Sequence, residues 1–144
     1  MQKILIIDDD YHILLMIKKM LERAGFEIDL ASNGNEGLEL FKKIPFDLVI
    51  TDIIMPEKEG LETIREMKRI HSDFKIIAMS GGGKISADNY LETAKIFGAS
   101  TVLGKPFTQK QLVTAVQEVL EGYSDDNPYN GKEGTDNSLE KEQG

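Results

Sequence analysis

Four polar segments of this chain carry side chains that could support chemistry, and each follows a short apolar run. They are the acidic triplet Asp8-Asp9-Asp10, then Asp52, Ser80 and Lys105. Carboxylates are preferred ligands of hard divalent cations such as Mg²⁺, and an aspartate can also attack phosphorus to form an aspartyl phosphate. A hydroxyl and an ammonium can stabilise the oxygens of a transferring phosphoryl group. These residue types together indicate metal-assisted phosphoryl transfer.

The elements that must position these side chains alternate regularly. The expected strands lie at residues 4–7, 27–31, 48–51, 75–79 and 101–103, and most of them are apolar runs. Apolar residues with helical spacing follow each run, in segments 13–24, 33–44, 61–67, 86–97 and 112–120. Five strands alternating with five helices predict an α/β fold, a doubly wound parallel sheet with helices on both faces. Continuous apolar strands are typical of a sheet that is buried on both sides.

In such a sheet the ligand site lies beyond the carboxyl ends of the strands. Here the first strand ends in the acidic triplet, the third in Asp52, the fourth in Ser80-Gly81 and the fifth in Lys105. Two carboxylates about 4 Å apart repel by roughly 4 kcal/mol at an effective dielectric near 20, and Lys105 alone is an incomplete counterion for several of them. The sequence therefore predicts a Mg²⁺ site at this edge, with one carboxylate placed to attack a phosphoryl group.

Three neighbouring features have simpler interpretations. Asp10 is expected to cap the first helix, because its carboxylate can accept the unpaired N–H groups there. The isolated His12 and His71 are expected to be solvated. The run Gly81–Gly83 lacks the spacing of a P-loop, but its small residues let backbone N–H groups approach a phosphate.

The composition bounds the class of protein. The 144 residues, 40% hydrophobic and 29% charged, predict one soluble domain, and the lack of cysteine excludes disulfides and thiolate metal sites. A net charge of −8 argues against direct nucleic-acid binding. Because no apolar run reaches signal-peptide or membrane-spanning length, we expect a cytoplasmic protein. Residues 1–123 are expected to fold, and 124–144 to form a disordered acidic tail.

Four motifs resemble those of the receiver domains of two-component response regulators, including the chemotaxis-type single-domain regulators. They are Asp8-Asp9, Asp52-Ile-Ile-Met-Pro56 with Gly60, Met-Ser80, and Lys105-Pro106-Phe107. Each motif is weak alone, but the four occur in order at the ends of the first, third, fourth and fifth expected strands. The resemblance covers about residues 2–122 and implies a flavodoxin-like sheet with strand order 2-1-3-4-5.

The resemblance also implies a metal-dependent phosphoacceptor. Asp52 would receive a phosphoryl group from a histidine kinase, a phosphotransfer protein or a small phosphodonor. Asp9 and Asp52 would hold Mg²⁺ together with the main-chain carbonyl of Ile54, and Asp8 would act mostly through metal-bound water. We expect from this a signalling protein rather than an enzyme.

Further implied roles fall on the later motifs, with two departures from the family pattern. Ser80 and Lys105 would contact the phosphoryl group, and the Lys105–Pro106 peptide bond would be cis. Val102 stands three positions before the lysine, where the family often has an aromatic switch residue, so an aromatic rotamer switch is not expected. Ile54 replaces a polar side chain that orients water in other members, so a fairly long-lived phosphoryl group is expected.

Three functions are weighed. The first is a phosphorylation-controlled switch that binds a downstream protein through the fourth helix, fifth strand and fifth helix. The second is a dehalogenase-type phosphohydrolase, in which Asp8 would be the nucleophile and Asp10 would complete a D-x-D pattern; the chain lacks the expected cap domain and late acidic pair. The third is a phosphorylation-independent interaction module, which the complete set of Asp9, Asp52, Ser80 and Lys105 disfavours.

Overall fold

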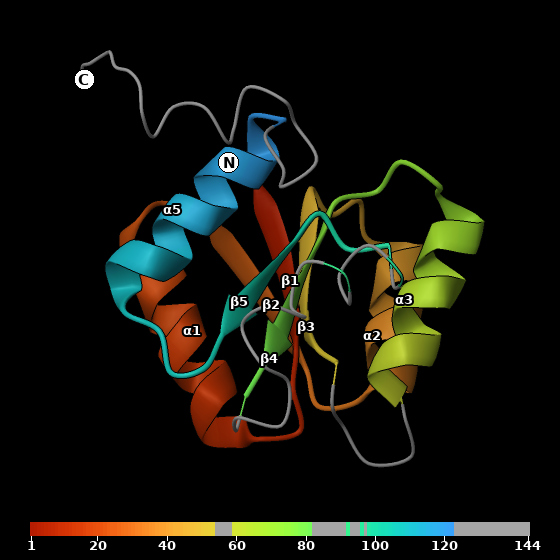
Figure 1. The fold of residues 1–144 in the computed structure, drawn as a ribbon, viewed down its shortest axis with the longest axis horizontal. Helices are drawn as coiled ribbons and strands as arrows, with labels where there is room; N and C mark the ends of the chain where they lie inside the picture. Colours follow the sequence, from red (N-terminus) through yellow and green to blue (C-terminus); the bar gives the residue numbers. More distant parts are fainter. Residues whose placement is uncertain (54–58, 82–91, 93–95, 97, 123–144) are drawn as a thin grey trace.

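The structure is a computed structural model that describes residues 1–53, 59–81, 92, 96 and 98–122. Figure 1 shows a central sheet between two layers of helices. The five strands are β1 (Lys3–Ile7), β2 (Glu27–Ala31), β3 (Leu48–Asp52), β4 (Ile76–Ser80) and β5 (Thr101–Gly104). The helices of the described residues are α1 (Tyr11–Arg23), α2 (Gly34–Lys43), α3 (Glu59–Ile70) and α5 (Gln109–Leu120).

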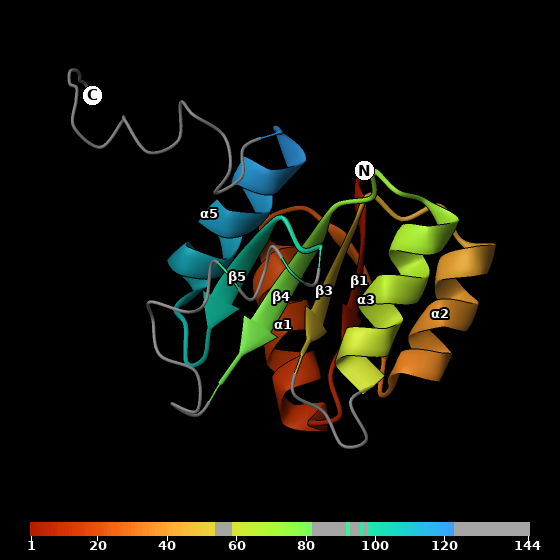
Figure 2. The same cartoon turned by 45° about the vertical axis from the view of Figure 1, so that its right-hand side comes forward.

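The sheet confirms the expected fold class and strand order. Its order is β2-β1-β3-β4-β5, and each neighbouring pair is parallel. Every residue of β3 and β4 is buried, as the continuous apolar runs predicted for strands covered on both faces. All five strands consequently run in the same direction, and Figure 2 shows the arrows of β3, β4 and β5 pointing to the same end of the molecule.

The helices cover both faces of the sheet, as expected of a doubly wound fold. In Figures 1 and 2, α1 and α5 lie on one side of the strands, and α2 and α3 lie on the other. The expected fourth helix, over residues 86–97, lies outside the described residues, and so does the expected tail at 124–144. Among the described residues, no helix combines the length and apolar composition needed to cross a membrane.

Side-chain caps explain where three of the helices begin. The carboxylate of Asp10 accepts hydrogen bonds from the backbone N–H groups of His12 and Ile13, at 2.9 and 3.4 Å, so the expected cap of the first helix is confirmed. Asn33 caps α2 in the same way, and Thr108 forms a capping box with Gln111 at the start of α5. Asp10 therefore fixes the start of α1, which follows the acidic residues Asp8 and Asp9, and Thr108 fixes the start of α5, which follows Lys105.

The sheet separates two hydrophobic clusters. The α1/α5 cluster includes Leu14, Ile17, Leu112 and Val116 packed on one face of the sheet. The α2/α3 cluster occupies the other face and is continued by partly buried residues such as Val102. On this second face, Gly37 of α2 lies directly against the side chain of Ile7, leaving no room for a Cβ atom. Close packing on both faces holds the carboxyl ends of the strands in fixed relative positions.

Candidate metal and phosphoryl site

The carboxyl edge of the sheet gathers the polar residues expected there. Asp8 comes directly after β1, Asp52 and Ser80 are the last residues of β3 and β4, and Lys105 comes directly after β5. Asp8, Asp52 and Ser80 are all buried. Because the four strands are neighbours in a parallel sheet, residues far apart in the sequence meet within one small region.

Lys105 joins two of the carboxylates. Its Nζ atom donates hydrogen bonds to Asp8 Oδ2 at 2.8 Å and to Asp52 Oδ2 at 3.2 Å. The second oxygen of Asp8 accepts the backbone N–H of Asp10 at 2.8 Å. Asp8 is thus held from both sides, and the Asp10 N–H is a positioning group that sequence analysis missed, because backbone donors leave no mark in the residue types.

Burial and charge shift the pKa values of this ion pair. Burial raises the pKa of Asp8 above its ordinary value, although the bonds from Lys105 and from the Asp10 N–H oppose the increase. Burial alone would lower the pKa of Lys105, but its bonds to Asp8 and the charge of Asp52 outweigh that effect, and its pKa is raised. Lys105 therefore stays protonated, whereas the negative charge on Asp8 is only partly compensated.

Three carboxylates converge closely enough to hold one cation. Asp8, Asp9 and Asp52 each offer an oxygen, and these oxygens all lie within 4.8 Å of one another. Asp8 and Asp52 are buried and Asp9 is exposed, so one side of the cluster is open to water. An all-oxygen set with water access suits Mg²⁺, which is usually bound by few carboxylates and keeps several waters. The backbone carbonyl of Ile54, the other expected ligand, lies outside the described residues.

Ser80 contributes an unusual hydroxyl. Its side chain is completely buried, and among the described residues its Oγ is the buried side-chain atom that lacks a hydrogen-bond partner. A buried hydroxyl without a partner costs about 1–3 kcal/mol, so its presence at the end of β4 needs an explanation. A ligand oxygen arriving at this edge would supply the missing partner.

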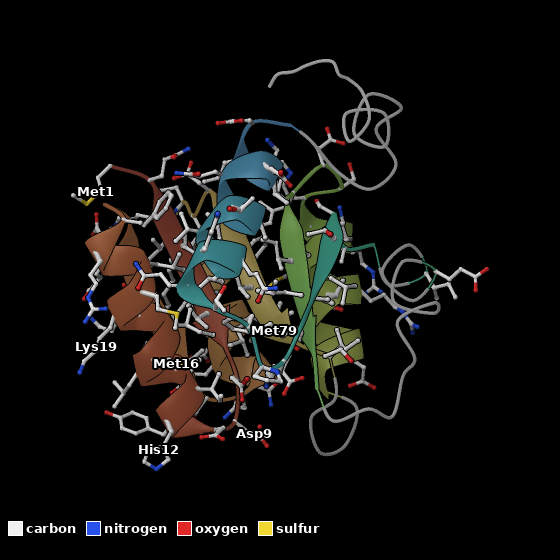
Figure 3. The ribbon with its side chains drawn as sticks, turned by 60° about the vertical axis from the view of Figure 1, so that its left-hand side comes forward. Met1, Asp9, His12, Met16, Lys19 and Met79 are labelled. Carbon is white, nitrogen blue, oxygen red and sulfur yellow. The ribbon has the colours of Figure 1, made fainter. Side chains whose placement is uncertain are left out.

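The expected neighbours of these residues take distinct places. Gly81 is half-buried beside the Lys105 side chain, and the Lys105–Pro106 peptide bond is cis. Val102 is half-buried in the α2/α3 cluster. The exposed His12 points away from the sheet near Asp9 at the beginning of α1 (Figure 3). Gly82 and Gly83 lie outside the described residues.

Asp10 does not occupy the position that a dehalogenase-type mechanism would need. Its carboxylate is committed to the N–H groups at the start of α1, and its backbone N–H holds Asp8. Asp8 itself is enclosed, with both oxygens bonded and no exposed surface. The geometry therefore gives no support to Asp8 as the nucleophile.

Comparison with known proteins agrees with this arrangement. A family model described as the response regulator receiver domain matches residues 4–117. The chain is 34% identical over 119 residues to the chemotaxis protein CheY of Thermotoga maritima, covering 82% of this chain and 97% of CheY. It is 32% identical over 120 residues to the transcriptional regulatory protein CpxR of Escherichia coli K12, covering 83% of this chain. The match spans 50% of the length of CpxR.

A solved structure shows the same likeness in three dimensions. The response regulator protein TrrA of Thermotoga maritima, in complex with Mg²⁺ and BeF, has a TM-score of 0.71 and 34% identity to this chain. The likeness covers 83% of this chain and 99% of that structure. Sequence motifs, strand order and the carboxyl-edge geometry thus agree with the family model: the chain belongs to the response regulator receiver domain family.

Proposed function

We propose that this chain is a phosphorylation-controlled switch that accepts a phosphoryl group on Asp52 in a Mg²⁺-dependent reaction. The observation that carries the proposal is the convergence of Asp52 with two further carboxylates, the Lys105 ammonium and the unpaired Ser80 hydroxyl. A cluster of carboxylates alone would indicate only a cation-binding site. The added hydroxyl and ammonium match the oxygens of a phosphoryl group.

In the proposed reaction an oxygen of the Asp52 carboxylate attacks phosphorus. A P–N bond breaks if the donor is a phosphohistidine, and a P–O bond breaks if it is a small acyl phosphate; the leaving group takes the bonding electrons. An aspartyl phosphate results. Asp52 is 6% exposed and Asp8 is fully buried, so of these two carboxylates Asp52 is the one that an incoming donor can reach.

Mg²⁺ would be held by Asp8, Asp9 and Asp52, with the Ile54 carbonyl as a further ligand. When bound, it supplies positive charge next to the phosphoryl oxygens. The solved TrrA structure contains Mg²⁺ with BeF, which supports the same metal here. The oxygen-only ligand set and the incomplete compensation of Asp8 support it independently.

Ser80 and Lys105 would bind the transferred group. The Ser80 hydroxyl would gain a hydrogen-bond partner, which it lacks among the described residues, and the Lys105 ammonium would move toward the new oxygens. Both changes pull β4 and β5 toward Asp52, because each residue lies at a strand end. With Val102 in place of an aromatic side chain, this signal passes without an aromatic rotamer change.

The phosphoryl donor would be a protein or a small phosphodonor, and the downstream partner would be a protein. A sensor histidine kinase or a phosphotransfer protein would deliver the group. A downstream protein would bind β5 and α5 together with the helix expected over residues 86–97, which lies outside the described residues. A groove of about 550 Å³ lies between β5 and α5, lined in part by Gly104, Pro106 and Ala115. Because Gly104 and Pro106 flank Lys105, a movement of the lysine reaches this groove directly.

The test is phosphorylation by acetyl phosphate in the presence of Mg²⁺, followed by intact mass. The parent chain is expected to gain one phosphate, and the gain should disappear with a chelator, with hydroxylamine treatment, or in Asp52→Asn. Asp47→Asn, an exposed aspartate that bonds the Lys3 N–H at the other end of β3, is the matched control and should behave as the parent. A phosphate gain that survives in Asp52→Asn would refute the proposal.

A further inference from the structure

Gly81 lies against the aliphatic stem of Lys105. A Cβ atom built on Gly81 would lie 3.3 Å from Lys105 Cδ, 3.4 Å from its Cβ and 3.8 Å from its Cγ. The separation from Cδ is tighter than nearly all real Cβ contacts, whereas those from Cβ and Cγ are ordinary van der Waals contacts, so a side chain at position 81 would push the Cδ end of the stem by a few tenths of an ångström. The lysine therefore occupies space that a larger residue would take.

The backbone does not require glycine at this position. Gly25, Gly98 and Gly122 have positive φ angles, whereas Gly81 does not. An alanine could therefore adopt the backbone conformation of Gly81 without strain. What distinguishes glycine here is the missing Cβ atom, and the atoms that benefit belong to Lys105.

The backbone N–H and the ammonium of Lys105 both make hydrogen bonds, so the path of the aliphatic stem between them determines where the ammonium lies. Its backbone N–H donates to the Ser80 carbonyl at 2.8 Å, which anchors the lysine beside the end of β4. Its Nζ bridges Asp8 at 2.8 Å and Asp52 at 3.2 Å. A displaced stem would shift the ammonium relative to two acceptors at the ends of different strands. The hydrogen bond to Asp52 is the longer of the two and would be lost first.

We propose that Gly81 is a positioning residue that allows the Lys105 stem to lie flat along the end of β4 and so places its ammonium between Asp8 and Asp52. This role differs from the phosphate contact expected of Gly81 from the sequence. It rests on the proposed function, because the benefit of placing the ammonium there is contact with a phosphoryl group on Asp52.

The test compares Gly81→Ala with the parent and repeats the comparison in a Lys105→Ala background. In the parent background, we expect the initial rate of phosphorylation by acetyl phosphate to fall about 3- to 10-fold, since shifts below 1 Å cost less than the roughly 100-fold of a full 1 Å misplacement. The Lys105→Ala background lacks the crowded Cδ atom and keeps only the ordinary contact with Cβ, so adding Gly81→Ala there should leave the residual rate unchanged within about 1.5-fold.

Thermal unfolding of the same four chains provides a readout that does not depend on phosphorylation. Gly81→Ala should lower the Tm in the parent background, and this decrease should vanish when Lys105 is alanine. If the parent gains phosphate and Gly81→Ala gains it at the same initial rate, this inference is overturned and the proposed function still holds. An effect that persists undiminished in Lys105→Ala would also overturn it. A parent that gains no phosphate would refute the proposed function and this inference with it.

Discussion

The Lys105 ammonium is shared between Asp8, at 2.8 Å, and Asp52, at 3.2 Å, and the shorter bond goes to Asp8 rather than to the expected phosphoacceptor. In the unphosphorylated chain, the lysine therefore compensates part of the charge of the proposed metal ligands. Binding of a phosphoryl group would draw the ammonium away from Asp8. The lysine thus has two alternative partners, one for each state of the switch.

Replacing Asp8 by asparagine should stabilise the metal-free protein at neutral pH. The buried carboxylate has a raised pKa, which means that its surroundings favour the neutral form even with Lys105 beside it. We expect Asp8→Asn to increase the free energy of unfolding by about 1 kcal/mol at pH 7 in the presence of a chelator, because it removes the cost of burying the Asp8 charge and, to a smaller extent, its repulsion from Asp52. Denaturant unfolding measures this change, and Glu39→Gln, at an exposed site, is the control.

The same substitution should change the pH dependence of stability. The folded chain holds the Asp8 proton more tightly than the unfolded chain, so the stability of the parent falls as the pH rises from 3.8 through the raised folded pKa. The advantage of Asp8→Asn should therefore shrink toward zero as the pH is lowered to that range. An advantage that grows on acidification would contradict this account. Saturating Mg²⁺ should reverse the order, because the parent binds the metal more tightly.

Replacing Ser80 by alanine should separate stability from function. The Ser80 hydroxyl has no partner among the described residues, so its removal should leave the free energy of unfolding unchanged or raise it by up to about 1 kcal/mol. Phosphorylation by acetyl phosphate should nevertheless slow by about 10-fold or more, the scale of losing one donor to developing charge. Equal rates in Ser80→Ala and the parent would contradict the proposed phosphoryl contact; the exposed Ser72→Ala is the control for both measurements.

Replacing Gly37 by alanine should destabilise the fold although alanine favours helices. A Cβ atom at position 37 would collide with the side chain of Ile7 on β1, and overpacking of this kind costs about 1–3 kcal/mol. Asn35→Ala, at an exposed position of the same helix, should instead raise stability by a few tenths of a kcal/mol or so. Urea unfolding of the two variants compares them directly, and a Gly37→Ala chain as stable as the parent would mean that α2 can move away from β1.

Replacing Ile54 by glutamate should shorten the life of the phosphoryl group. Isoleucine has no polar atom to orient a water molecule toward phosphorus, and a carboxylate supplies one. We expect the Ile54→Glu chain to lose its phosphate about 10-fold faster than the parent, which is in the lower part of the usual range of rate enhancement by a positioned general base. The loss is measured by intact mass over time after the donor is removed. Ile70→Glu, half exposed at the end of α3, is the control. A parent half-life of seconds would contradict the expectation.

The fold could be predicted from the sequence because its signals are local. Apolar runs marked most of the strands, and Asp10 marked the start of the first helix through its own side chain. The strand order followed from the family resemblance, since no local pattern states which strands are neighbours. The helix expected at residues 86–97 lies outside the described residues and stays a prediction.

The sequence was enough to predict which residues meet at this edge of the sheet, but only part of their geometry. The parallel sheet requires Asp8, Asp52, Ser80 and Lys105 to share an edge, so residue types at strand ends were sufficient. The bond from the Asp10 N–H to Asp8 and the fit of Lys105 against Gly81 depend on backbone direction and side-chain path. Such distances are set by packing across the whole sheet and are not encoded in any short motif.

The division of the core by the sheet has a consequence for how this protein can diversify. The α1/α5 cluster and the α2/α3 cluster lie on opposite faces, so substitutions in one can accumulate and be compensated locally while the other is left intact. The strand ends that hold the acids, the hydroxyl and the lysine belong to the layer between them. A lineage of such proteins could therefore exchange the surface that recognises one partner for another while inheriting the same chemistry unchanged.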